Sequence, residues 1–209
     1  MEIEYKGANA VVISTKKLDV LVDPKLTEVG LKDLTSKHGC IVATQTGFVP
    51  KDTGDNVVID GPGEYEVENI SISGEAVERM IDHDGSKQAT VYRIATSDVA
   101  LAVVGHCSVP LSEEQLEALG VVDIAVVPVG GNGYTLNASQ AVEVVRQLDP
   151  KVVIPTHYAD KAVKYEVPQE DVDVFIKELS AQVEEVPKLK IKNGQLPEAL
   201  TVYKLSRTA

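Results

Sequence analysis

Short apolar runs dominate the first part of the chain and predict β-strands. The segments 2–7, 10–16 and 18–25 ("EIEYKG", "AVVISTK" and "LDVLVDPK") either alternate apolar and polar residues or run apolar. Only short polar breaks separate these segments, and this spacing is typical of an antiparallel meander. Further runs at 56–61, 63–68 and 69–77 continue the strand pattern and turn at glycines or at polar pairs.

One helix is expected among these early strands. Residues 25–39 ("KLTEVGLKDLTSKHG") carry four apolar side chains at helical spacing, and Gly39 follows them as a stop. The run "CIVATQ" (40–45) comes next and reads as a strand that ends in polar residues. The first part of the chain is therefore mainly strands with one interruption.

The second part of the chain alternates strands with helices. A hairpin is expected at 89–105, and later strands are expected at 123–131, 151–157 and 199–205. Three amphipathic segments predict helices: 112–120, which opens with the capping-box pair Ser112 and Gln115; 137–149, capped by Asn137; and 168–180, with Pro168 in its first turn.

This order of elements predicts an α/β fold with two mixed sheets. Meander strands come first and strand–helix–strand units follow, which fits a four-layer αββα sandwich formed by one domain over residues 1–209. A single doubly wound sheet is the alternative, but the early hairpins count against it.

The charge balance excludes some classes of partner. The chain has 20 Lys and Arg against 32 Asp and Glu, a formal net charge of −12. Such an acidic surface argues against nucleic acid and against an anionic membrane as the main partner, and leaves a small-molecule ligand or substrate. No signal segment or bilayer-length apolar run is visible, so we expect a cytoplasmic protein in which Cys40 and Cys107 are buried free thiols.

Three of the four histidines follow or separate strand-like runs. His83 lies between Asp82 and Asp84, His106 follows "VALAVVG", and His157 follows "KVVIP". If these strand ends converge, three imidazoles could hold one Zn²⁺ or a similar ion, although each histidine alone reads as an ordinary loop residue. Tyr158 follows His157 and extends this polar strand end.

Other strand ends supply weaker candidates. Asp23 precedes Pro24 at the end of a strand, where it could cap a turn or orient a ligand. Gln45 ends another strand and is a poor ligand for a transition metal. In "GGNGYTL" (130–136), Gly131 and Asn132 either present backbone N–H groups to an anion or form a tight turn that needs positive φ.

With these residues laid out, the chain resembles the metallo-β-lactamase fold superfamily, and within it the group of predicted zinc-dependent hydrolases. The resemblance rests on "LDVLVDP", "IDGPGEYEV", "HDG" before "TVYRI", and above all the continuous stretch from "LSEEQLEALG" to "VVIPTHY". It implies an αββα sandwich with a metal site at one edge, between the sheets. It also implies that His157 is the last metal-binding histidine, that His83 lies near the middle one, and that His106 takes the place of the bridging aspartate.

One departure from the superfamily is large. Its H-x-H-x-D-H motif should follow the strand "CIVAT", but residues 45–50 read "QTGFVP". The residues that hold the first metal and orient the attacking water are therefore missing, and we do not predict a dinuclear centre. Two interpretations follow: a binding or regulatory protein with a degenerate site and at most one metal, or a hydrolase with a mononuclear zinc held by His83, His106 and His157. In the second, Asp82 or Asp84 would orient His83.

Overall fold

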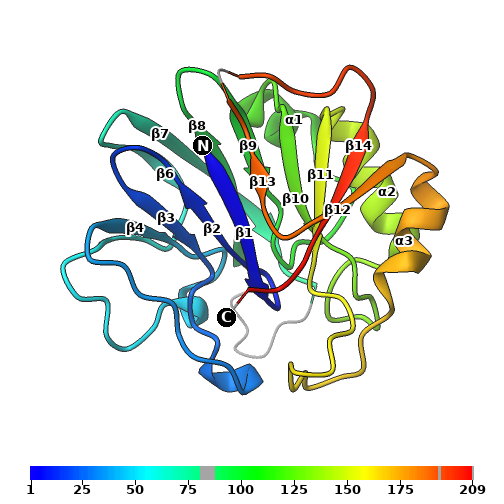
Figure 1. Cartoon of the computed structure of the whole chain (residues 1–209), viewed down its shortest axis with the longest axis horizontal. Helices are drawn as coiled ribbons and strands as arrows, with labels where there is room; N and C mark the ends of the chain where they lie inside the picture. Colours follow the sequence, from blue (N-terminus) through cyan, green and yellow to red (C-terminus); the bar gives the residue numbers. More distant parts are fainter. Residues whose placement is uncertain (81–87, 193, 209) are drawn as a thin grey trace.

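Two mixed β-sheets packed face to face form the centre of the protein (Figure 1). The computed structural model describes residues 1–80, 88–192 and 194–208. The predicted fold class, two mixed sheets in an α/β sandwich, is confirmed. Both predicted thiols, Cys40 and Cys107, are buried and free.

The six-stranded sheet contains most of the first part of the chain. In spatial order its strands are β13 (Leu189–Lys190), β1 (Glu2–Gly7), β2 (Ala10–Ser14), β3 (Asp19–Val22), β4 (Gly39–Val42) and β5 (Val57–Ile59). Strands β1, β2 and β3 are antiparallel neighbours, as the meander pattern predicted, whereas β4 and β5 run parallel to β3.

The eight-stranded sheet combines an antiparallel half with a parallel half. Its order is β12 (Gln182–Val186), β14 (Thr201–Leu205), β11 (Val152–Thr156), β10 (Ile124–Pro128), β9 (Ala100–Val103), β8 (Gln88–Ala95), β7 (Ile70–Glu78) and β6 (Gly63–Val67). Strands β6 to β9 are antiparallel, and β9, β10, β11, β14 and β12 are parallel.

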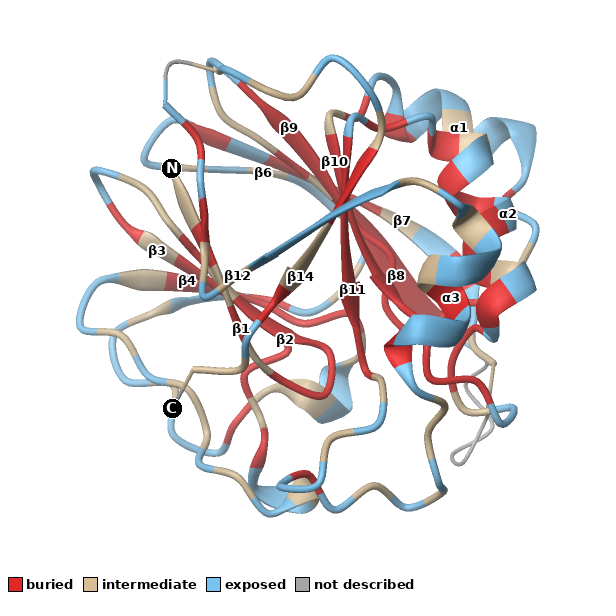
Figure 2. Cartoon of the chain, turned by 45° about the vertical axis from the view of Figure 1, so that its right-hand side comes forward, coloured by how far each residue is buried: buried red, intermediate tan, exposed pale blue. Residues whose placement is uncertain are grey.

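Three α-helices cover the outer face of the eight-stranded sheet (Figure 2). They are α1 (Glu113–Leu119), α2 (Ala138–Leu148) and α3 (Val172–Leu179). The predicted capping box of α1 and the Asn137 cap of α2 are both present. None of the helices in the described parts of the chain has the length and apolar character needed to cross a bilayer.

The central strands are apolar throughout because both of their faces are buried. On β10, Ile124 and Val126 belong to the core between the two sheets, whereas Ala125 and Val127 pack in the layer between the sheet and the helices. This two-sided burial explains why β10 and β11 read as continuous apolar runs rather than as alternating ones.

The helix predicted for 25–39 is wrong. Only a 3₁₀ turn, η1 (Thr27–Val29), forms there, and it ends at Gly30 in the left-handed conformation. The carboxylate of Asp33 accepts hydrogen bonds from the backbone N–H groups of Leu26 and Thr27 and folds the segment back on itself. The apolar side chains still pack, but against Ala8 and Ala10 instead of along a helix. A side-chain acceptor that competes for backbone donors therefore overrides the helical spacing.

The helix predicted from Pro168 begins later, at Val172. Its N-cap is Asp171, whose side chain accepts from Asp173 N. Residues 168–170 lie outside the helix, and Glu170 is held by the neighbouring loops: its N–H donates to Gly130 O at 2.7 Å, and its carbonyl accepts from Ala159 N. The short strands β12 and β13 were not predicted, and the polar, mostly exposed residues of β12 explain why its pattern was missed.

A buried hydrogen-bond network joins the two sheets at one edge. Asp23, at the end of β3, accepts from Asn9 Nδ2 at 2.6 Å, from Thr44 N at 2.7 Å and from Thr44 Oγ1 at 2.8 Å. Asn9 Oδ1 in turn accepts from Thr156 Oγ1, at the end of β11 in the other sheet, at 2.7 Å. All four residues are buried, so each bond is made away from water.

We predict that Asp23→Asn lowers the free energy of unfolding by about 2–3 kcal/mol, because an amide in place of the carboxylate leaves at least one buried donor unpaired. Asn tolerates the left-handed backbone of Asp23, φ 44°, so the change tests the acceptor and not the backbone. Urea denaturation at pH 7 measures the effect. Asp55→Asn, at an exposed turn, is the matched control, and equal stability of the two variants would contradict the prediction.

Candidate functional site

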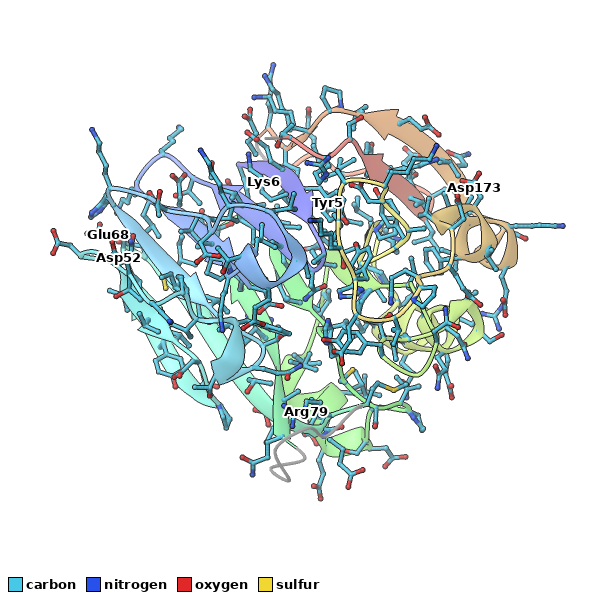
Figure 3. All side chains as sticks on the ribbon, turned by 90° about the horizontal axis from the view of Figure 1, so that it is seen from below. Tyr5, Lys6, Asp52, Glu68, Arg79 and Asp173 are labelled. Carbon is cyan, nitrogen blue, oxygen red and sulfur yellow. The ribbon has the colours of Figure 1, made fainter. Side chains whose placement is uncertain are left out.

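A cavity of about 310 Å³ opens at the edge where the two sheets meet. This is the lower edge in Figure 1, and Figure 3 views the molecule from that side. Loops from both sheets line the cavity: the β1–β2 turn, the segment after β3, η2 (Thr46–Phe48), and the segments that follow β9, β10 and β11. Its walls include Asn9, Asp23, His106, Tyr134, His157 and Tyr165.

His106 and His157 lie side by side in the wall of this cavity. Their ring centroids are 4.7 Å apart with planes at 86°, and both residues are buried. The structure therefore brings together two of the three predicted histidines. The third, His83, lies outside the described residues, as do Asp82 and Asp84.

The position of His157 is fixed by contacts to both sheets. It follows the last residue of β11, its φ is 51°, and its backbone N–H donates to Ala8 O in the β1–β2 turn at 2.6 Å. The neighbouring loop comes so close that a Cβ on Gly130 would clash with the carbonyl oxygen of His157. Gly130 is therefore needed for the approach of the β10–α2 loop to His157.

A hydrogen bond to Gln169 sets the tautomer of His157. His157 Nδ1 lies 3.1 Å from Gln169 Oε1, and Gln169 Nε2 donates to Val167 O at 2.9 Å, which fixes the orientation of the amide. An amide oxygen can only accept, so Nδ1 carries the proton. The Nε2 atom of His157 is left with a lone pair, the form in which an imidazole accepts a hydrogen bond or ligates an ion.

His106 is held by the strand beside it. Its carbonyl accepts from Met80 N at 3.0 Å, and Cys107 forms an isolated bridge with Arg79. Gly105 before it adopts φ 65°, and a Cβ there would lie 2.7 Å from the side chain of Thr44. His106 Nε2 is buried and has no hydrogen-bond partner among the described residues. A buried polar atom without a partner is expected where a ligand or ion completes a site.

Burial keeps both imidazoles neutral. It lowers the pKa of His157 to about 4, against the opposing effect of the bond to Gln169. Burial, together with the nearby His157 and Arg79, also holds the pKa of His106 well below its usual range. Two protonated imidazoles this close in a buried site would repel each other, so the uncharged pair is the stable form near pH 7.

Asp23 contributes a buried carboxylate to the cavity wall. Burial raises its pKa to about 6, although the hydrogen bonds from Asn9 and Thr44 lower it in part. Since those three bonds already engage the carboxylate, Asp23 acts as a structural acceptor that positions the surrounding loops.

Aromatic rings complete the cavity, and sequence reasoning missed them. Phe48 and Tyr134 each meet His106 with ring centroids 5.2 Å apart, and Tyr165 meets His157 at 4.8 Å. Tyr134 lies in the glycine loop that was singled out, but neither Phe48 nor Tyr165 belongs to a motif. Only the folding of three separate loops brings these rings together.

Four other predicted residues lie outside this cavity. Gln45 accepts a hydrogen bond from Arg79 Nη1 at 2.9 Å and lines a neighbouring cavity of about 270 Å³ (Arg79 is labelled in Figure 3). Tyr158 stacks on Tyr5 with centroids 5.5 Å apart, inside the core.

Asn132 is exposed and donates to Pro168 O at 2.7 Å. Gly131 has φ 69°, and its N–H donates to Thr135 Oγ1 and Leu136 O within the turn. The tight-turn interpretation therefore holds for Gly131, whose N–H is not available to an anion.

The described residues do not fit a dinuclear metal centre. Within residues 1–80, 88–192 and 194–208, no group of three or more His, Cys, Asp or Glu side chains is placed to hold an ion. The only carboxylate in the buried part of the wall, among these residues, is Asp23, which is already bonded to three donors. Two close cations need more negative charge than the described, buried part of this wall provides.

We predict a pH dependence of stability that comes from His157. The unfolded side chain takes up a proton near pH 6.5 and the folded one only near pH 4, so the contribution of His157 to the free energy of unfolding rises with pH across this window, whereas the raised pKa of Asp23 contributes in the opposite direction. The rise from this residue is on the order of 3 kcal/mol. After chelator treatment, the free energy of unfolding at pH 7 minus that at pH 4 should be smaller in His157→Gln than in wild type by this amount. His38→Gln, at an exposed position, should show the same difference as wild type. Parallel profiles for wild type and His157→Gln would contradict the prediction.

Known proteins share this fold over nearly its full length. A candidate zinc-dependent hydrolase of the metallo-β-lactamase superfamily from Thermotoga maritima has a TM-score of 0.78 and 24% identity, and the match covers 98% of both chains. Igni18, a metallo-hydrolase from Ignicoccus hospitalis, has a TM-score of 0.62 and 18% identity over 86% of this chain and 90% of its own. At these identities the likeness establishes the fold.

The sequence itself also matches known proteins. A UPF0173 metal-dependent hydrolase from Natranaerobius thermophilus is 44% identical over 43 residues, which is 21% of this chain and 19% of that relative. The match thus spans about a fifth of the curated relative. The model of the beta-lactamase superfamily domain matches residues 2–157, which include β1 to β11 and His157. Together with the shared fold, this match shows that the chain belongs to the beta-lactamase superfamily, with the metallo-β-lactamase fold.

Proposed function

We propose that the chain binds a small organic molecule in the cavity and has a binding or regulatory role, without two-metal hydrolysis. The observation that carries this proposal is the segment after β4, where residues 45–50 read "QTGFVP" and contain no imidazole or carboxylate. Thr44, just before it, donates both its N–H and its hydroxyl to Asp23. The protein is expected to work in the cytoplasm, as its sequence predicts.

The chemistry of the remaining side chains supports a binding role. Two-metal hydrolysis relies on ligands that clamp both ions and on a group that orients the attacking water. Among the residues that the structure describes, the buried titratable groups of this cavity are two neutral imidazoles and one carboxylate already bonded to three donors. These groups can position a polar ligand, but they do not provide the charge that holds two ions.

A mononuclear zinc hydrolase is the second candidate, and the geometry of the two histidines favours it. His106 Nε2 has no partner among the described residues, and the Nε2 atom of the adjacent His157 keeps its lone pair. Three protein ligands and one water form the usual catalytic zinc site, so a third ligand such as His83 would be required. Relatives of the chain are described as metal-dependent or zinc-dependent hydrolases. A bound zinc would supply a water with a pKa of about 7.

We predict no appreciable hydrolysis of a chromogenic cephalosporin or of bis-p-nitrophenyl phosphate, with Zn²⁺ or Mn²⁺ added. The physical reason is the missing group that orients the attacking water. Release of product is followed by absorbance. Robust turnover that requires metal and disappears in His157→Ala would overturn the proposed binding role and favour the zinc hydrolase.

We also predict well under one equivalent of zinc in protein purified without added metal. Two described imidazoles make a weak site compared with the three or four ligands of stable zinc sites. Elemental analysis measures the content. About one zinc per chain in wild type, retained in His38→Gln and lost in His106→Phe, would instead establish the mononuclear site.

A further inference from the structure

The aromatic walls of the cavity indicate what kind of ligand it accepts. Phe48, Tyr134 and Tyr165 come from three separate loops, and with the two imidazoles they form a chain of rings with neighbouring centroids 4.7–5.7 Å apart. Rings at these separations present flat faces and edges that attract another ring. The ring of Tyr165 is positioned before any ligand binds, because its hydroxyl donates to Tyr158 O at 2.9 Å.

The charges of the cavity argue for an uncharged ligand. Of the four charged side chains near its mouth, Lys25 and Glu28 already form an ion pair at 2.7 Å, and Lys164 and Glu166 carry opposite charges. Deeper in the wall, Asp23 is bonded to three donors. Positive and negative charges therefore balance among these four side chains, so a ligand with a net charge would lose hydration on burial without meeting an excess of the opposite charge there.

The volume sets the size of the ligand. A cavity of about 150 Å³ is enough for one benzene ring. The cavity described above measures about 310 Å³, roughly twice that volume, and so has room for two fused rings.

We propose that this cavity binds an uncharged, planar aromatic or heteroaromatic molecule of about two fused rings, packed against Tyr165, Phe48 and Tyr134. This inference rests on the proposed binding role and names the class of ligand for it. The rings supply affinity through stacking and buried apolar area, and the balanced mouth excludes ligands with a net charge.

Four matched probes test the proposal on the full chain after chelator treatment, at pH 7. They are 2-naphthol, the anion 2-naphthoate, the cation 2-naphthylmethylammonium, and decahydro-2-naphthol, which keeps the carbon skeleton but is not planar. We expect 2-naphthol to bind at least about tenfold more tightly than either charged probe. It should bind roughly 2–10-fold more tightly than the saturated alcohol, the range given by aromatic pairing. Naphthalene fluorescence reports the binding of the three aromatic probes, and the chain lacks tryptophan, which would interfere. The binding of decahydro-2-naphthol is measured by competition with 2-naphthol.

Two variants of one residue separate the ring from its hydroxyl. Tyr165→Phe keeps the ring and should keep the affinity for 2-naphthol within about twofold, whereas Tyr165→Leu should lose about three- to tenfold and the preference for the planar probe. Phe48→Leu repeats the test on another loop. Tyr65→Leu, on β6 and outside the cavity, is the control and should bind as wild type does. Thermal unfolding checks that each variant is folded.

The binding results separate three claims: the role of the Tyr165 ring, the class of ligand, and the binding role of the cavity. An equal loss of affinity for 2-naphthol in Tyr165→Phe and Tyr165→Leu overturns the role of the ring. Equal or tighter binding of a charged or saturated probe overturns the ligand class but leaves the binding role intact. Absence of binding by every probe also overturns the ligand class, and if metal-dependent turnover of the phosphodiester is found in addition, the proposed function fails with it.

Discussion

The buried carboxylate of Asp23 is the interaction on which the rest of this edge depends. It accepts from Asn9 and from both donors of Thr44, and through Asn9 it reaches Thr156 in the opposite sheet. One network of direct hydrogen bonds thus joins the first part of the chain to the strand that precedes His157. Burial raises the pKa of Asp23 to about 6, because a carboxylate charge is costly away from water. Its three donors offset part of that cost and hold the carboxylate in a structural role.

The network determines how closely the loops approach each other, and this approach places the two imidazoles. Because Asn9 is tied to Thr156, the turn that contains Ala8 can accept the hydrogen bond of His157 N. On the other side, Thr44 lies so close to Gly105 that no Cβ fits there, and His106 follows immediately. The geometry of the pair thus results from backbone contacts on both sides. Binding to rings that are already positioned in this way requires little rearrangement.

The sequence predicted the sheets and the strand ends but not the walls between them. Two-sided burial leaves a clear trace, so β10, α2 and β11 were placed correctly, and with them His157. The helix predicted for 25–39 was wrong because the carboxylate of Asp33 accepts hydrogen bonds from the backbone N–H groups of Leu26 and Thr27. Hydrophobic periodicity does not reveal such a contact. Phe48 and Tyr165 were missed for a related reason. Loop residues belong to a site only through the tertiary position of their loops, and a single sequence carries no pattern for that.

The uncharged segment after β4 affects the electrostatics of this edge of the fold. A wall built for two cations would carry several carboxylates, and without ions those carboxylates would repel one another. Here the segment after β4 is neutral, and burial, the dominant effect, keeps the pKa of both His106 and His157 low enough for them to stay uncharged. The cavity is therefore stable without a counter-charge. Such a cavity gains more from filling its aromatic walls with an uncharged ring than from burying a ligand with a net charge, because the charged side chains at its mouth balance one another.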